Sequence, residues 1–176
     1  MQGEIGRPVG LRALRDGEEI ELTVKLVRYP LQLPELPGPR EVGSKAPPLD
    51  LEYLPDGPRL ADGRSHLLFF WATWRQPCKL SIPEVLAFER ERDIEVVAIS
   101  DETPETIQAF LDKLSGPFPE IVAMDPMRAN FQEYGVSGTP SFVWVDAGGT
   151  VRHASTGYNR KKGLQIDGWR WASEPN

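Results

Sequence analysis

The sequence predicts an α/β sandwich of three layers, in which a mixed central sheet of about five strands is flanked by helices. Apolar runs of strand length alternate along the chain with stretches of helical periodicity, as in strand–helix–strand units. The pattern closes with two short apolar runs around residues 146–149, Asp-Ala-Gly-Gly, which is typical of a hairpin turn. The length of 176 residues allows one full domain and a small N-terminal appendage.

Residues 1–30 are predicted to form a separate helix–strand fragment. Residues 8–15 are interpreted as a short helix with two leucines on one face, and Asp16-Gly17 is a turn signal. Residues 19–28 then alternate between apolar and polar side chains, which indicates a half-buried strand. One helix and one strand cannot enclose a core, so we expect this fragment to dock on the main domain or on a segment absent from this chain.

Residues 31–42 are predicted to be a proline-rich linker. Six of the 17 prolines fall between Tyr29 and Pro48. Proline lacks a backbone donor and favours extended structure, so a stiff connection is expected. The alternative is an ordered arm that lies along the main domain, which is predicted over residues 43–176.

Strands of the main domain are predicted over residues 49–53, 67–73, 94–99, 121–124, 141–145 and 151–155. The run 67–73 is continuously apolar, as in a central strand covered on both faces. Helices are predicted over residues 79–92, 103–114 and 127–134. The tail, residues 163–176, contains Leu164, Ile166, Trp169 and Trp171; a short helix, an arm over the sheet and an interface all stay open for it.

Charge and hydropathy limit the possible partners. Twenty basic against 26 acidic side chains give a net charge of -6, whereas nucleic-acid binding normally needs a basic face. The longest apolar run, residues 67–73, is far shorter than the ~20 residues of a membrane helix. No charged-then-apolar leader opens the chain. We therefore expect no nucleic-acid partner and no transmembrane segment in this chain.

The single cysteine, Cys78, is the sharpest limit on chemistry. One cysteine excludes an intrachain disulfide and a zinc site built on cysteines. The two histidines, His66 and His153, cannot supply a three-histidine metal site. No metal and no cofactor are therefore predicted. Cysteine usage leaves the redox compartment open, because one cysteine suits either environment.

Residues 70–79, Phe-Trp-Ala-Thr-Trp-Arg-Gln-Pro-Cys-Lys, resemble the active-site segment of the thioredoxin superfamily. The resemblance is closest to the bacterial TlpA/ResA-like redoxins, which usually carry Trp-Ala-Thr-Trp-Cys-x-Pro-Cys there. Pro83 matches a proline of the following helix, Gly138-Thr139-Pro140 resembles the cis-proline loop, and residues 43–47 resemble the usual entry to redoxin domains. The resemblance runs from about Gly43 to Gly157. It implies a thioredoxin-like fold and a thiol–disulfide oxidoreductase family.

The same resemblance bears on location and on the N-terminal fragment. The TlpA/ResA-like branch is extracytoplasmic, which suggests a periplasmic or secreted protein although no signal segment is present. Residues 6–28 resemble the last helix and strand of a PDZ domain, which would make this chain the C-terminal part of a longer protein.

Arg75 departs from the family pattern at the decisive position. Family members have there the exposed, low-pKa cysteine that attacks substrate disulfides, and the cysteine matching Cys78 resolves the mixed disulfide. Without the first thiol, dithiol exchange by the family mechanism cannot occur. Phe69 aligns with a buried Asp or Asn, and Ser81 aligns with a Glu; both are candidate proton-handling groups in the family. The pattern therefore predicts a degenerate active site.

Each residue of this predicted site has two interpretations. Cys78 is either an inert buried thiol or a reactive single thiol, because burial raises a thiol pKa while the helix N-terminus and Arg75 lower it. Arg75 is either a solvated charge or an anchor for a carboxylate or phosphate. Pro140 is expected to be cis, against an ordinary trans turn, and Trp74 to lie at the rim, against core packing.

Two functions follow. The first is single-thiol redox chemistry through Cys78 with a protein or peptide that itself contains a thiol. The second is a non-catalytic peptide- or protein-binding module. For that module, the resemblance implies a binding groove formed by Trp74, Pro77, Thr139 and Pro140.

Overall fold

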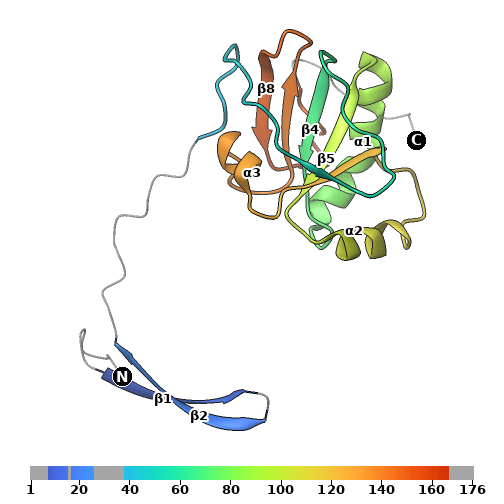
Figure 1. Ribbon diagram of the computed structural model, residues 1–176. Coiled ribbons are helices and arrows are strands. Elements are labelled where there is room, and N and C mark those ends of the chain that lie inside the picture. The colour runs from blue at the N-terminus through green and yellow to red at the C-terminus, as the bar shows by residue number, and fades with distance from the viewer. Residues whose placement is uncertain (1–7, 16, 26–37, 167–176) are drawn as a thin grey trace. The chain divides into compact units, whose positions relative to one another are not determined.

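The computed structural model describes residues 8–15, 17–25 and 38–166 (Figure 1). The chain divides into two compact units, Met1–Glu35 and Leu36–Asn176. Residues 31–37 of the predicted linker lie outside the described residues, as do Trp169 and Trp171 of the tail.

The described part of the N-terminal unit is a β-hairpin, so the helix predicted over residues 8–15 is wrong. Strand β1 (Pro8–Arg15) pairs antiparallel with β2 (Glu18–Lys25). Three cross-strand pairs, Val9 with Val24, Leu11 with Leu22 and Ala13 with Ile20, place apolar side chains on one face.

The physical reason for the error lies in the turn and in the alternation. Gly17 has φ +86°, the left-handed conformation that a short hairpin turn requires. Val9, Leu11 and Ala13 alternate with other residues at a period of two, and Gly10 disfavours a helix interior. The two leucines at a spacing of three suggested a helical face, but cross-strand pairing decides the structure.

The main unit is built on a mixed sheet, which in the described residues has six strands rather than about five. The strands are β3 (Glu52–Tyr53), β4 (His66–Phe70), β5 (Glu95–Ser100), β6 (Ile121–Met124), β7 (Ser141–Val145) and β8 (Val151–Thr156). Their order is β3-β6-β5-β4-β7-β8, with β4, β5 and β6 parallel and the other neighbours antiparallel. The parallel strands are central and buried, as their continuous apolar sequences predict.

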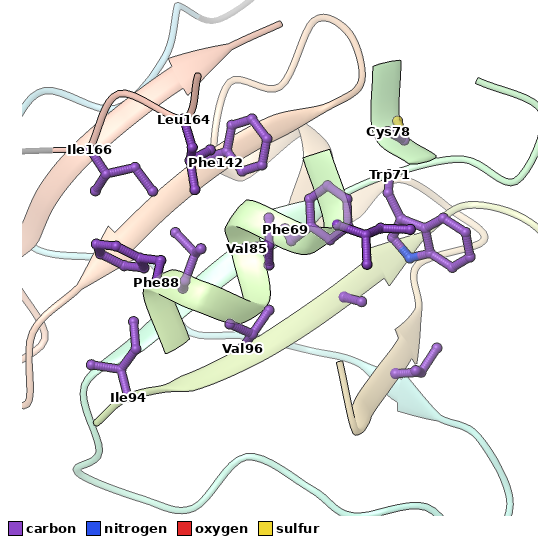
Figure 2. Packing of buried hydrophobic residues seen from close by; sticks show 14 of the residues in the cluster. Phe69, Trp71, Cys78, Val85, Phe88, Ile94, Val96, Phe142, Leu164 and Ile166 are labelled. Carbon is purple, nitrogen blue, oxygen red and sulfur yellow. The ribbon is translucent and has the colours of Figure 1, made fainter. Parts of the chain in front are cut away.

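Helices cover both faces of this sheet, which confirms the three-layer sandwich. Helices α1 (Gln76–Arg92) and α2 (Pro104–Leu111) contribute Val85, Phe88 and Ile107 to the core on one face. The short α3 (Ala129–Glu133) contributes Phe131 to the core on the opposite face, where it meets Phe70. Figure 2 shows the first of these cores.

A buried carboxylate on α1 fixes the segment that follows β8. Glu84 is 5% exposed, and its Oε1 accepts a hydrogen bond of 2.6 Å from the Tyr158 hydroxyl. Its Oε2 accepts a hydrogen bond from the backbone N–H of Leu164. Leu164 and Ile166 then join the core beside α1 (Figure 2). Burial, and secondarily the bond to Glu84, raise the pKa of Tyr158 above its ordinary value.

We expect Glu84→Gln to lower the free energy of unfolding by about 1–3 kcal/mol. The amide can still accept from the Leu164 N–H, but the Tyr158 hydroxyl must then accept from the amide NH2, so the hydroxyl proton loses its charged acceptor inside the protein. Urea unfolding monitored by circular dichroism measures the change. The matched control is Glu52→Gln, an exposed residue of the edge strand β3, which should change stability by less than about 0.5 kcal/mol. Equal effects of the two substitutions would contradict the structural role of Glu84.

Candidate functional site at the start of α1

The segment that carries the sequence motif runs from the end of β4 into the first turn of α1. The Trp71 N–H donates to the Ile99 carbonyl of β5 at 2.9 Å, and the Arg75 N–H donates to the Ala72 carbonyl at 3.2 Å. Arg75 is the N-cap residue of α1, without a side-chain cap hydrogen bond. Pro77 lies in the first helical turn, where the missing N–H costs nothing. This path places Cys78 one turn into the helix, with its N–H donating to the Arg75 carbonyl at 3.1 Å.

The loop before β7 lies against this turn. The Thr139–Pro140 peptide is cis, as the sequence predicts. Strand β7 pairs with β4, with Ser141 opposite Phe70, so the loop and the turn leave neighbouring strands at the same edge of the sheet. The Nε atom of Arg75 donates a hydrogen bond to the Thr139 carbonyl. The structure therefore brings together two segments that are far apart in the sequence, Arg75 to Cys78 and Thr139 to Pro140.

The Cys78 side chain is fully buried, at 0% exposure. Burial is the largest influence on its thiol and raises its pKa. Hydrogen bonding to the Ala72 backbone and the Thr139 side chain and the charge of Arg75 act to lower that pKa, whereas the charge of Glu102 acts to raise it. The net direction is upward, so the thiol is protonated at neutral pH.

Trp74 and Arg75 precede this thiol in the chain and are both exposed. Trp74 is 69% exposed, so it lies at the rim and not in the core. The Arg75 guanidinium carbon lies 5.7 Å from the centre of the Trp74 ring, a cation–π contact. Arg75 thus spans from the exposed Trp74 to the Thr139 carbonyl. Trp71, three residues earlier, is buried against Phe110 and Phe118.

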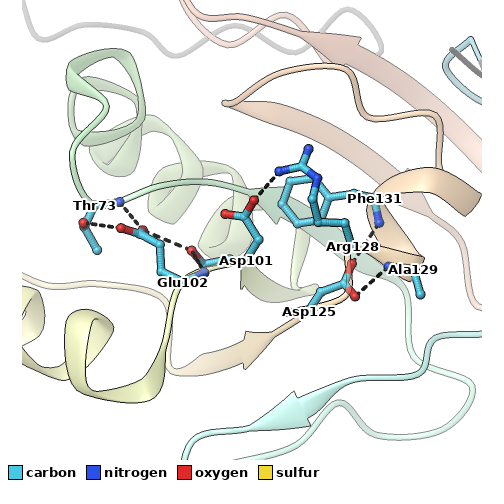
Figure 3. Close-up of polar contacts among 8 residues, drawn as sticks. Thr73, Asp101, Glu102, Asp125, Arg128, Ala129 and Phe131 are labelled. Carbon is cyan, nitrogen blue, oxygen red and sulfur yellow. Dashed lines mark hydrogen bonds and ion pairs between the residues drawn. The ribbon is translucent and has the colours of Figure 1, made fainter. Parts of the chain in front are cut away.

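Sequence reasoning missed one ionisable residue of the site, Glu102. This residue follows β5, and its carboxylate accepts hydrogen bonds from the Thr73 N–H at 2.6 Å and from the Thr73 hydroxyl at 2.7 Å (Figure 3). The Ser100 hydroxyl donates a third, at 3.1 Å. One signal could have found it: the polar run Ser100-Asp101-Glu102 directly follows a buried strand parallel to the one that carries the motif, and such strands end at the same edge of the sheet.

The other acidic residues at this edge have structural partners. Asp101 pairs with Arg128, and Asp125 accepts hydrogen bonds of 2.9 Å from the backbone N–H groups of Ala129 and Phe131 at the start of α3 (Figure 3). Across the described part of the chain, no cluster of three or more His, Cys, Asp or Glu side chains is arranged to hold a metal ion.

A family model of the redoxins matches residues 41–167. The chain belongs to the redoxin family. Among curated relatives, the thiol:disulfide interchange protein DsbE of Allochromatium vinosum is 30% identical over 85% of this chain and 82% of its own length. HelX of Rhodobacter capsulatus, also a thiol:disulfide interchange protein, is 31% identical over 62% of this chain. The match covers 58% of HelX and 61% of the thiol-disulfide oxidoreductase ResA of Bacillus thuringiensis, so it spans less than two thirds of these relatives.

Solved structures agree with this assignment. A DsbE-like thiol:disulfide interchange protein from Chlorobium tepidum is 29% identical, with a TM-score of 0.54 over 69% of this chain and 89% of its own. The AhpC protein of Mycobacterium tuberculosis, at 15% identity and a TM-score of 0.56, shares the fold alone. The redoxin is thus a TlpA/ResA-like member of the thioredoxin superfamily. In its described residues, no helix is long and apolar enough to cross a membrane.

The two further positions that the sequence singles out, 69 and 81, carry no ionisable side chain. Phe69 lies in the core, with its ring 5.5 Å from that of Phe142. Ser81 is buried, and its hydroxyl donates to the Cys78 carbonyl at 2.8 Å. Neither position therefore supplies a group that could take a proton from Cys78.

Proposed function

We propose that this redoxin is a polypeptide-binding protein that has lost dithiol exchange and retains the surface around Trp74, Thr139 and Pro140 as its binding site. The observation that carries the proposal is the contrast between its neighbouring residues. Cys78 is fully buried, while Trp74 beside it is 69% exposed. A site that works through its thiol needs the sulfur at the surface, whereas a binding site needs the aromatic side chain there.

The loss of exchange follows from counting thiols. Reduction of a substrate disulfide takes two electrons, and a dithiol supplies them by forming its own disulfide. This chain has one cysteine, so an attack by Cys78 could end only in a mixed disulfide that a separate thiol must cleave. Arg75 occupies the position of the missing thiol, and its Nε atom donates to the Thr139 carbonyl, which ties it to the loop beside Cys78.

The binding role rests on the chemistry of the exposed surface. Tryptophan is enriched among the residues that contribute most to binding at protein interfaces, because a large rigid ring buries area at a small entropic cost. Thr139 and Pro77 are half-buried and Pro140 is buried, so the Trp74 ring is the exposed apolar side chain of the proposed surface. An extended polypeptide with an apolar side chain fits such a surface.

The second candidate function is single-thiol chemistry through Cys78. Three contacts favour it, since the Ala72 backbone, the Thr139 side chain and the Arg75 charge all act to lower the thiol pKa. Burial outweighs them, which places this function second.

We expect Trp74→Ala to weaken the binding of an unfolded polypeptide by about tenfold or more. The probe is a permanently unfolded protein whose cysteines are carboxymethylated, titrated against the redoxin by calorimetry with reductant present. The matched control is Val42→Ala, because Val42 is also exposed, at 67%, but lies away from the site. Its neighbour Gly43 donates a hydrogen bond to Val151 at the start of β8, and the site lies at the other end of that strand. Equal affinities of the Trp74→Ala variant and the original chain would overturn the proposal.

A further inference from the structure

The turn that precedes α1 is hydrogen-bonded to one carboxylate from another part of the fold. Glu102 accepts both donors of Thr73, the backbone N–H and the side-chain hydroxyl, through its two oxygens. Hydrogen bonds to a charged acceptor are about twice as strong as neutral ones, and two on one residue also fix its orientation. The Ser100 hydroxyl donates a further hydrogen bond to the carboxylate, and the Glu102 N–H donates to the oxygen of that hydroxyl at 3.3 Å.

The two hydrogen bonds from Thr73 to Glu102, called the clamp below, lie one residue from a contact of the buried Cys78 thiol. Ala72, which precedes Thr73, contacts Cys78 through its backbone and accepts the hydrogen bond that closes the turn from the Arg75 N–H. A displacement of Thr73 therefore also moves Ala72. It would alter both the backbone contact with Cys78 and the hydrogen bond that closes the turn. Glu102 and Cys78 come from different elements, the loop after β5 and the first turn of α1.

We propose that Glu102 is a positioning residue that holds the Thr73 turn closed over Cys78 and directs a negative charge at its thiol. This assignment goes beyond the proposed function, because it concerns the state of Cys78 and does not depend on what the surface binds. Positions 69 and 81 carry no carboxylate, and the carboxylate beside this turn comes from the loop after β5.

Four groups of the chain act on the thiol besides its burial. The Ala72 backbone lies in the turn, Arg75 caps α1, Thr139 lies in the loop before β7 and Glu102 lies in the loop after β5. Arg75 and Glu102 carry the charges, and their effects on the thiol pKa are opposite. Removal of the negative charge leaves the positive one unopposed, so the thiolate becomes easier to form.

Two substitutions separate the charge of Glu102 from its hydrogen bonds. Glu102→Gln removes the charge, but its amide can still accept from the Thr73 N–H and donate to the Thr73 hydroxyl. Thr73→Val keeps the carboxylate and removes only the hydroxyl donor. The matched control is Asp101→Asn, which removes a charge one residue away whose partner is Arg128.

The test is a pH titration of thiolate absorbance near 240 nm. Cys78 is the single cysteine, so a Cys78→Ser variant supplies the background from tyrosine and tryptophan. We expect the midpoint of Glu102→Gln to fall and that of Asp101→Asn to stay unchanged. For Thr73→Val we expect alkylation of Cys78 to accelerate by about tenfold without a comparable fall in the midpoint.

An unchanged or higher midpoint in Glu102→Gln would overturn the role of the charge. Alkylation of Thr73→Val at the original rate would overturn the role of the clamp. Circular dichroism of each variant checks that it is folded, and the Thr73→Val arm tests the proposal even where Glu102→Gln does not fold.

Discussion

Cys78 in the folded chain is expected to react with an aromatic disulfide reagent at least about 100-fold more slowly than Cys78 in the unfolded chain. Two effects multiply. The side chain is fully buried, so the reagent must wait for a local opening, and each 1.4 kcal/mol of opening free energy slows the reaction by about tenfold. Burial also raises the thiol pKa, so little thiolate is present at neutral pH.

The measurement compares the colour release in buffer with that in concentrated guanidinium, at the same pH. The Cys78→Ser variant gives the blank, and glutathione gives the rate of a free thiol. If the folded chain reacted at a rate near that of glutathione, the sulfur would be accessible, and single-thiol chemistry would become the better account of this redoxin.

Arg75→Cys is expected to create a disulfide with Cys78 and to confer dithiol exchange. Residue 75 caps α1 with an extended backbone, and residue 78 lies three positions further, in the first helical turn. A disulfide needs the two Cβ atoms to lie about 3.5–4.5 Å apart, a separation that this bend between strand and helix must supply. The new thiol would be exposed at the helix N-terminus, where a thiolate is stabilised. We expect the rate of insulin reduction with dithiothreitol to rise by at least about tenfold over that of the original chain.

The matched control for this gain is Arg75→Ser, which opens the surface equally but adds no sulfur and should leave the rate at background. Intact mass after treatment with oxidised glutathione, before and after reduction, reports the disulfide itself. A variant that stayed fully reduced under these conditions would show that residues 75 and 78 do not have the geometry of the family turn.

Local patterns were sufficient for most of the fold. The apolar runs over residues 121–124 and 141–145 became β6 and β7 with unchanged bounds, because buried strands next to turn residues have few alternatives. The hairpin of β1 and β2 was missed because its stability comes from cross-strand pairs, which a helical spacing of two leucines cannot reveal.

The residues of the candidate site also divide into those that the local sequence revealed and those that it did not. Cys78, Arg75 and the cis Pro140 were found through the motif, which is local in sequence. Glu102 was missed because its connection to Thr73 exists only where two parallel strands end side by side. The burial of Cys78 likewise depends on contacts across the fold, so the sequence left its two interpretations open.

The central claim is that this redoxin binds polypeptides without using its thiol. The most direct test is the calorimetric titration with the carboxymethylated polypeptide, carried out on the original chain and on Cys78→Ser. We predict measurable binding in both, with dissociation constants that agree within about twofold, since a buried thiol contributes nothing to the surface that the polypeptide meets. Absence of binding by the original chain, or its loss on replacing this one sulfur, would contradict the account.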